Sequence, residues 1–172
     1  MKHNGRAVVS TSMEDLANRI DDPDLDVHAD DILVLQNIGP KGAPGMPEAG
    51  LIPIPKKLAI QGVKDMVRIS DGRMSGTASG TIVLHVSPEA AHNGPLALVR
   101  DGDLIELDVE NRVLALKVSD HELDKRRQET SCETPTENVL GYRKMFLEQI
   151  LQAEEGCDFR FSRPPQTSKV PR

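Results

Sequence analysis

Aromatic residues are almost absent from this sequence. Its 172 residues include three Phe, one Tyr and no Trp, so a core must be built from aliphatic side chains. The same scarcity argues against base-stacking platforms for single-stranded nucleic acid. Positive charge is also lacking, because 21 Lys and Arg stand against 27 Asp and Glu, which gives a net charge of −6. Proteins that bind the phosphates of DNA or RNA need clustered Lys and Arg, so the composition indicates no nucleic-acid partner.

Long hydrophobic runs and cysteines are scarce as well. The longest purely apolar runs, such as Ile32 to Leu35, have four residues, whereas a transmembrane helix needs about 20. The first residues lack the apolar segment of a signal peptide. The two cysteines, Cys132 and Cys157, cannot form a disulfide framework. We therefore expect a cytoplasmic protein with reduced thiols and no membrane partner.

Hydrophobic patterning predicts an α+β fold that is mainly β. Short apolar or alternating runs at close spacing are typical of a barrel or a sandwich. Seven strands are predicted, in the regions of Arg6, Ile32, Met66, Thr81, Leu96, Leu104 and Arg112. Helices are predicted after a capping Ser12, from 55 to 60, from 120 to 128 and from 139 to 153. The predicted divisions are a barrel domain (1–128), a linker with a C-terminal helix (129–160) and a disordered tail (161–172).

Two glycine-rich loops stand out as candidate functional segments. The first loop, residues 37–50, holds four Gly and three Pro and cannot form a regular element. The second loop, residues 70–80, is rich in Gly and Ser, and both loops follow predicted strands. Glycine lets a backbone approach a ligand and offers amide N–H groups to anions. Neither loop has the spacing of a nucleotide-binding motif, so the pattern favours a small, oxygen-rich ligand.

Each loop contains a residue suited to chemistry, Glu48 in the first and Ser75 in the second. Each also has an ordinary structural explanation. A loop carboxylate such as Glu48 commonly lies in solvent or caps a turn, and Ser75 and Thr77 are common turn formers that bond the local backbone. Arg73 and Asp71 could simply pair within the second loop. Composition and spacing alone leave these alternatives open.

The two loops together resemble the C-terminal domain of the dihydroxy-acid dehydratase and phosphogluconate dehydratase family. Residues 39–48, Gly-Pro-Lys-Gly-Ala-Pro-Gly-Met-Pro-Glu, resemble the family's Gly-Pro-x-Gly-x-Pro-Gly-Met-x-Glu loop. Residues 71–77, Asp-Gly-Arg-Met-Ser-Gly-Thr, resemble its Asp-x-Arg-[Phe/Met]-Ser-Gly segment. Segments 85–90, 94–99, 102–103 and 152–159 continue the resemblance, which covers residues 5–160.

The resemblance implies a swivelling-type β-barrel of about seven to eight strands with flanking helices. It also implies a hydro-lyase that removes water from a 2,3-dihydroxy acid to give a 2-keto acid, with Mg²⁺ and a [2Fe–2S] cluster. Glu48 would be a Mg²⁺ ligand, Ser75 the base that takes the C2 proton, and Thr77 a residue that holds the substrate or that serine. Met74 and the run that follows it resemble the sugar-acid branch, so we expect an aldonic acid that yields a 2-keto-3-deoxy acid.

The resemblance also implies that this chain is incomplete as an enzyme. The family's cluster cysteines and its other Mg²⁺ ligands, which include a modified lysine, belong to an N-terminal domain, and Cys132 and Cys157 do not match them. We expect the chain to be a fragment or split subunit, inactive alone, completed by an N-terminal dehydratase domain or companion chain, and homo-oligomeric. One alternative is a non-catalytic binding or assembly domain. A phosphate-carrying swivelling domain is disfavoured because His85 lies in a predicted strand, as a core histidine, and His92 lies outside both loops.

Overall fold

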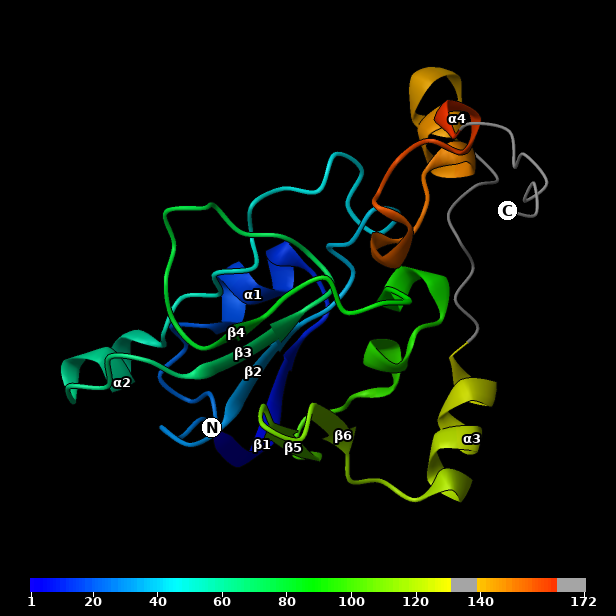
Figure 1. The fold of residues 1–172 in the computed structure, drawn as a ribbon. Coiled ribbons are helices and arrows are strands. Elements are labelled where there is room, and N and C mark those ends of the chain that lie inside the picture. Colours follow the sequence, from blue (N-terminus) through cyan, green and yellow to red (C-terminus); the bar gives the residue numbers. More distant parts are fainter. Residues whose placement is uncertain (131–138, 164–172) are drawn as a thin grey trace, which may run out of the picture.

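One mixed sheet forms the centre of the protein. The computed structural model describes residues 1–130 and 139–163, and within them six strands follow the order β4-β3-β2-β1-β5-β6. The strands are β1 (Lys2–Ser10), β2 (Ile32–Leu35), β3 (Val67–Ser70), β4 (Ile82–Val83), β5 (Leu104–Asp108) and β6 (Val113–Leu116). Strands β1 to β4 pair in parallel, whereas β1, β5 and β6 pair antiparallel. The sheet curls into a half-barrel (Figure 1).

Four α-helices accompany the sheet in the described ranges: α1 (Met13–Arg19), α2 (Lys56–Ile60), α3 (Asp120–Glu129) and α4 (Gly141–Gln149). The predicted cap of α1 is confirmed, because the Ser12 hydroxyl accepts a hydrogen bond of 3.0 Å from the Asp15 amide. Short 3₁₀ turns cover Ala90–His92, Pro95–Leu98, Ala153–Glu155 and Arg160–Ser162. In Figure 1, α3 and α4 lie on the opposite side of the molecule from α2.

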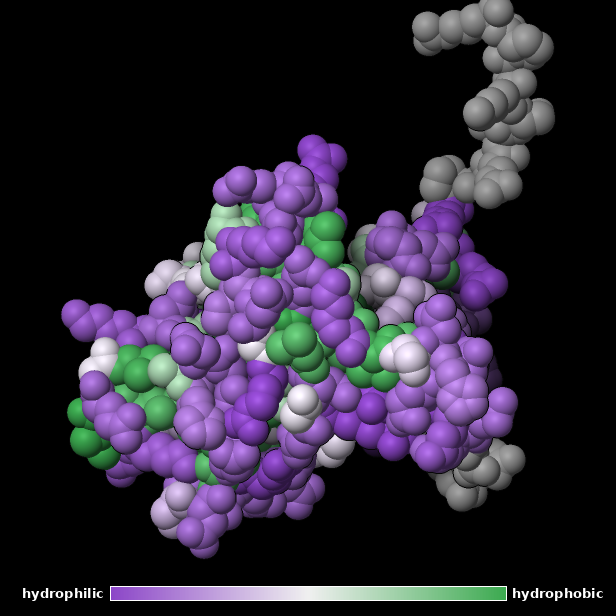
Figure 2. All heavy atoms as spheres, turned by 90° about the horizontal axis from the view of Figure 1, so that it is seen from below, coloured by the Kyte–Doolittle hydropathy of each residue, from purple (hydrophilic) through white to green (hydrophobic). Residues whose placement is uncertain are grey.

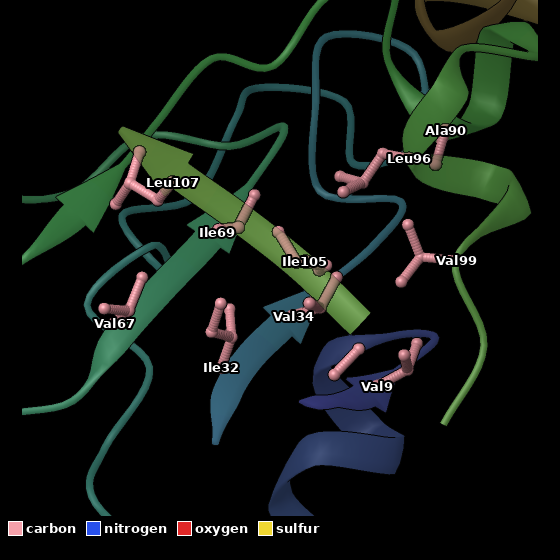
Figure 3. Close-up of a cluster of buried hydrophobic side chains, with 11 residues drawn as sticks. Val9, Ile32, Val34, Val67, Ile69, Ala90, Leu96, Val99, Ile105 and Leu107 are labelled. Carbon is pink, nitrogen blue, oxygen red and sulfur yellow. The ribbon is translucent and has the colours of Figure 1, made fainter. Parts of the chain in front are cut away.

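The core consists of two aliphatic clusters on the two faces of the sheet, as the scarcity of aromatics requires. Figure 3 shows the first cluster, in which alternate residues of neighbouring strands, such as Ile32, Val34 and Ile69, point toward β5 and the 3₁₀ turns. Leu33 and Leu35 point the other way and pack with Ile52, Leu58 and others. Strand β2 is therefore buried on both faces, which explains its uninterrupted apolar sequence.

The predicted strand count of seven to eight is not confirmed. Residues 96–99 were expected to form a strand, but Pro95–Leu98 is a 3₁₀ helix. Pro95 favours the first turn of a helix, and the Gln36 side-chain amide donates to the carbonyl oxygens of Leu96 and Val99 at 2.7 and 3.1 Å. A short buried apolar run does not distinguish a strand from a buried helical turn.

Other boundaries also shift. The strand predicted from 81 to 86 is reduced to β4, and His85 is exposed with φ of +54°, so it is not a core histidine within a strand. The helix predicted over 139–153 is α4, and Leu140, expected on its buried stripe, is 83% exposed just before it. Residues 131–138 and 164–172, which hold Cys132 and most of the predicted linker and tail, lie outside the described residues. No described helix has the length and apolar character needed to cross a membrane.

Candidate active-site loops

The first and second loops lie side by side at one edge of the sheet. They follow β2 and β3, which are parallel neighbours with Leu35 opposite Ser70, so both leave the sheet at its carboxyl-terminal edge. The Gly50 amide donates to the Arg73 carbonyl oxygen at 2.8 Å, and Arg73 Nε donates to the Met46 carbonyl oxygen at 2.6 Å. Crevices at this edge of parallel sheets are common ligand sites.

The first loop is anchored by a buried carboxylate, Glu89, which is 1% exposed. Its Oε1 accepts from the Lys41 amide at 2.9 Å, and its Oε2 accepts from the amides of Lys41 and Gly42 at 3.0 and 2.9 Å. Gln152 donates from Nε2 to Glu89 Oε1 at 2.7 Å and accepts from the Glu89 amide at 2.9 Å. The loop is therefore fixed through its backbone, and the C-terminal segment shares in the anchor.

A second buried carboxylate, Asp71, holds the start of the same loop. Asp71 is fully buried, and its oxygens accept from the amides of Asn37, Ile38 and Ala90 at 3.1, 3.0 and 2.9 Å. Burial raises the pKa of the Asp71 carboxyl, and the nearby Glu89 carboxylate adds to the rise, although the three amide hydrogen bonds oppose it. Asp71 therefore joins both loops and the turn at Ala90.

Arg73 pairs with Glu48 and not with Asp71, which corrects the alternative considered from the sequence. Arg73 Nη1 lies 3.3 Å from Glu48 Oε1, and each side chain is 47% exposed. The exposure means that this ion pair contributes little to stability. Its consequence is local, because it sets the Glu48 carboxylate at the surface where the two loops meet.

Ser75 and Thr77 are bonded to each other in the second loop. Their hydroxyl oxygens are 3.0 Å apart, and the Thr77 amide donates to Ser75 Oγ at 3.4 Å. Ser75 is partly exposed and Thr77 is exposed. This is the local bonding of a turn former, and it also places two hydroxyl groups together at the surface of the loop.

The described residues offer a single candidate ligand and no complete metal site. No group of three or more His, Cys, Asp or Glu side chains that could hold a metal ion occurs in residues 1–130 and 139–163. The Glu48 carboxylate is an oxygen donor of the kind that Mg²⁺ prefers, so it fits as a single ligand. A cluster held by cysteines does not fit, because Cys157 stands alone among the described residues and burial raises the pKa of its thiol.

The sequence did not predict an anchoring role for Asp71, Glu89 or Gln152. Each lies within or at the start of a segment quoted for the resemblance, but the partners of the two carboxylates are mainly backbone amides of the first loop. Backbone amides are identical at every non-proline residue, so no side-chain pattern marks such pairs. The one available signal was the acidic residue Asp71 directly after the buried strand β3.

Comparison with known proteins gives a consistent result. Residues 1–157 match the family described as dihydroxy-acid/6-phosphogluconate dehydratase C-terminal. The chain is 49% identical over 177 residues to an L-arabonate dehydratase of Azospirillum brasilense, which involves 99% of this chain and 30% of that protein. It is 52% identical over 162 residues to a 6-deoxy-6-sulfo-D-gluconate dehydratase of Pseudomonas putida, involving 93% of this chain and 28% of that protein. A dihydroxy-acid dehydratase of Archaeoglobus fulgidus is 41% identical over 158 residues, 91% of this chain and 28% of its own length. The chain thus spans less than a third of each of these relatives.

Proposed function

Because this chain belongs to the dihydroxy-acid/6-phosphogluconate dehydratase family, we propose that it is the C-terminal part of a sugar-acid hydro-lyase. The remainder of the active site would come from an N-terminal dehydratase part. The observation that carries the proposal is the pairing of the two loops at the edge of the sheet, with Glu48 in one and Ser75 in the other. The names of the two relatives near 50% identity favour an aldonic acid as substrate.

In the proposed reaction, the Ser75 hydroxyl is first ionised, and its Oγ alkoxide takes the proton from C2 of the substrate. The electron pair of the C2–H bond forms a C2–C3 double bond, and the hydroxyl on C3 leaves and takes up that proton to give water. The enol product becomes the 2-keto acid when a proton moves from its C2 hydroxyl to C3. Thr77 Oγ1, 3.0 Å from Ser75 Oγ, would donate to the serine oxygen and stabilise its alkoxide before the proton is taken. Glu48 would be one Mg²⁺ ligand, once its carboxylate is no longer restricted to Arg73. Mg²⁺, when bound, supplies positive charge beside the substrate oxygens.

The buried anchors have a supporting part in this proposal. Asp71 and Glu89 hold the first part of the first loop through the backbone amides of residues 38, 41 and 42. The position of Glu48 therefore depends on a loop that is fixed before substrate binds. Arg73 then connects that loop to the one that contains Ser75. An iron–sulfur cluster would belong to the N-terminal part, since the described residues do not fit one.

The alternative is a non-catalytic assembly domain. It is favoured by the Glu48–Arg73 ion pair and by the local bonding of Ser75 and Thr77, because each of the three candidate site residues then has a partner within the loops. The two hypotheses differ in the effect expected when Ser75 is substituted. Only the catalytic one requires the Ser75 hydroxyl for turnover.

The test uses this chain produced together with the N-terminal part of the Azospirillum L-arabonate dehydratase, with dehydration of L-arabonate as the readout. We expect turnover by the mixture and none by this chain alone. Ser75→Ala should lower kcat by at least about 100-fold, the usual contribution of a general base, whereas Ser79→Ala in an exposed part of the same loop should not. Glu48→Gln should raise the Mg²⁺ concentration needed for activity. Full activity of Ser75→Ala would reject the catalytic proposal.

A further inference from the structure

An open apolar groove runs beside Glu48. It has a volume of about 630 Å³ and lies between α1 and the segment that follows the first loop. Its walls are mostly aliphatic, and its lining includes Leu16, Ala17 and Ile20 on one side and Leu51, Ile52 and Ile54 on the other. Glu48 also lines it, so the groove is continuous with the surface where the two loops meet.

Large hydrophobic side chains at this groove are in contact with water. Met13 is 46% exposed and Leu51 is 39% exposed. Single exposed hydrophobic residues are ordinary on protein surfaces. The face drawn in Figure 2 shows several separate hydrophobic patches within a mostly hydrophilic surface. A continuous apolar groove beside a candidate site differs from such scattered residues, because a contiguous apolar surface usually marks a binding site for a ligand or another protein.

Arg68 is the one buried cation in the lining described for the groove. This residue of β3 is 4% exposed and lines the groove, and its Nη1 pairs with Asp65 Oδ1 at 3.0 Å. Its Nε is buried and has no hydrogen-bond acceptor among the described residues. A buried donor without an acceptor is costly, so the lining of the groove contains one unsatisfied polar group.

We propose that the N-terminal part of the dehydratase docks in this groove. The inference rests on the proposed function, which needs that part to reach Glu48. The relatives contain more than two thirds of their length beyond the region matched here, and the matched family domain is the C-terminal one. The docked segment is expected to be apolar, to match the mostly aliphatic lining of the groove. It would hold the N-terminal metal ligands against the first loop.

The test measures the dissociation constant of the complex between this chain and the N-terminal part of the Azospirillum L-arabonate dehydratase. Met13→Glu and Leu51→Glu each place a charge on an exposed wall of the groove, where the free chain tolerates it. Each should weaken binding by at least about tenfold, the effect of losing one moderate interface contact. Val109→Glu, a matched change at a residue 55% exposed after β5, should have no effect. Circular dichroism of each free variant verifies folding.

The outcomes separate this inference from the proposed function. A complex that forms, is weakened by the groove variants and yet does not dehydrate L-arabonate supports docking and rejects catalysis. A complex that dehydrates L-arabonate with unchanged affinity in both groove variants rejects docking and leaves catalysis standing. Failure of the two parts to associate, or a groove that only joins two copies of this chain, would also overturn the docking proposal.

Discussion

Substitution of Glu89 by Gln changes the side chain little in shape but reverses the direction of its hydrogen bonding. Both Glu89 oxygens accept, Oε1 from Lys41 and Gln152, and Oε2 from Lys41 and Gly42. The amide group of Gln would direct N–H bonds at one of these sets of donors, whichever way it is turned. Gln152 cannot relieve the conflict by rotating its own amide, because its Oε1 already accepts from the Glu89 amide.

The expected loss of stability follows from these contacts. Hydrogen bonds to a charged group contribute about 1.5–3 kcal/mol each, and Gln would lose one or two of them. Burial of a neutral amide is less costly than burial of a carboxylate, which offsets part of the loss. We therefore expect Glu89→Gln to lower the free energy of unfolding by about 2–4 kcal/mol.

The assay is urea denaturation at pH 7 followed by far-ultraviolet circular dichroism, since the chain has no Trp and one Tyr. Glu110→Gln is the control, because the Glu110 side chain is 84% exposed and its change should stay within about 0.5 kcal/mol. Amide hydrogen exchange should also accelerate at Lys41 and Gly42 in Glu89→Gln. An unchanged midpoint together with unchanged exchange at these two amides would refute the anchoring role.

Two further substitutions test the packing and the charge network. Gly94→Ala should cost at least about 3 kcal/mol or prevent folding, because a Cβ there would stand 1.6 Å from the Pro88 carbonyl oxygen, and thermal unfolding measures it. Lys117 and Lys2 bond the Glu106 carboxylate and hold its pKa below the ordinary 4.5. This stabilisation is complete above pH 4.5 and is lost as the pH falls through the lowered pKa. Glu106→Gln should therefore melt lower than wild type at pH 7, with a difference that closes in acid, and a constant difference would contradict the assignment.

Local chemistry predicted much of the fold. Ser12 begins α1 as its capping pattern indicated, and β2 coincides with the only long run of branched aliphatic residues near it. The alternation predicted for Ile105, Leu107 and Val109 correctly places Ile105 and Leu107 in the core, whereas Val109, just after the end of β5, is 55% exposed. Prediction failed at 96–99, where a strand and a buried turn share one pattern. The choice depends on Pro95 and on the distant Gln36 side-chain amide, which donates to the Leu96 carbonyl oxygen.

The candidate site was likewise predicted only in part from the sequence. The two loops were recognisable from their glycines, and their adjacency follows from the parallel pairing of β2 and β3. The supports were not recognisable, because Asp71 and Glu89 act on amides 33 and 48 residues away in the chain. The roles of Glu48, Ser75 and Thr77 and the cofactors remain predictions that rest on resemblance, and the cytoplasmic location remains a prediction that rests on composition.

The composition of the first loop explains why two buried carboxylates, Asp71 and Glu89, hold it in place. A segment rich in Gly and Pro has few side chains to pack, so its backbone amides are the main groups by which it can be held. Asp71, in the second loop, supplies carboxylate oxygens as acceptors and also accepts from the Ala90 amide. Glu89 supplies the other acceptors, and its carboxylate is bonded in turn to Gln152. The C-terminal segment is thereby linked to the first loop, and the family match accordingly extends past α4 to residue 157. Buried acids hold the loop from within while Glu48 lies at its surface, so the residues that fix this loop differ from the residue proposed as a metal ligand.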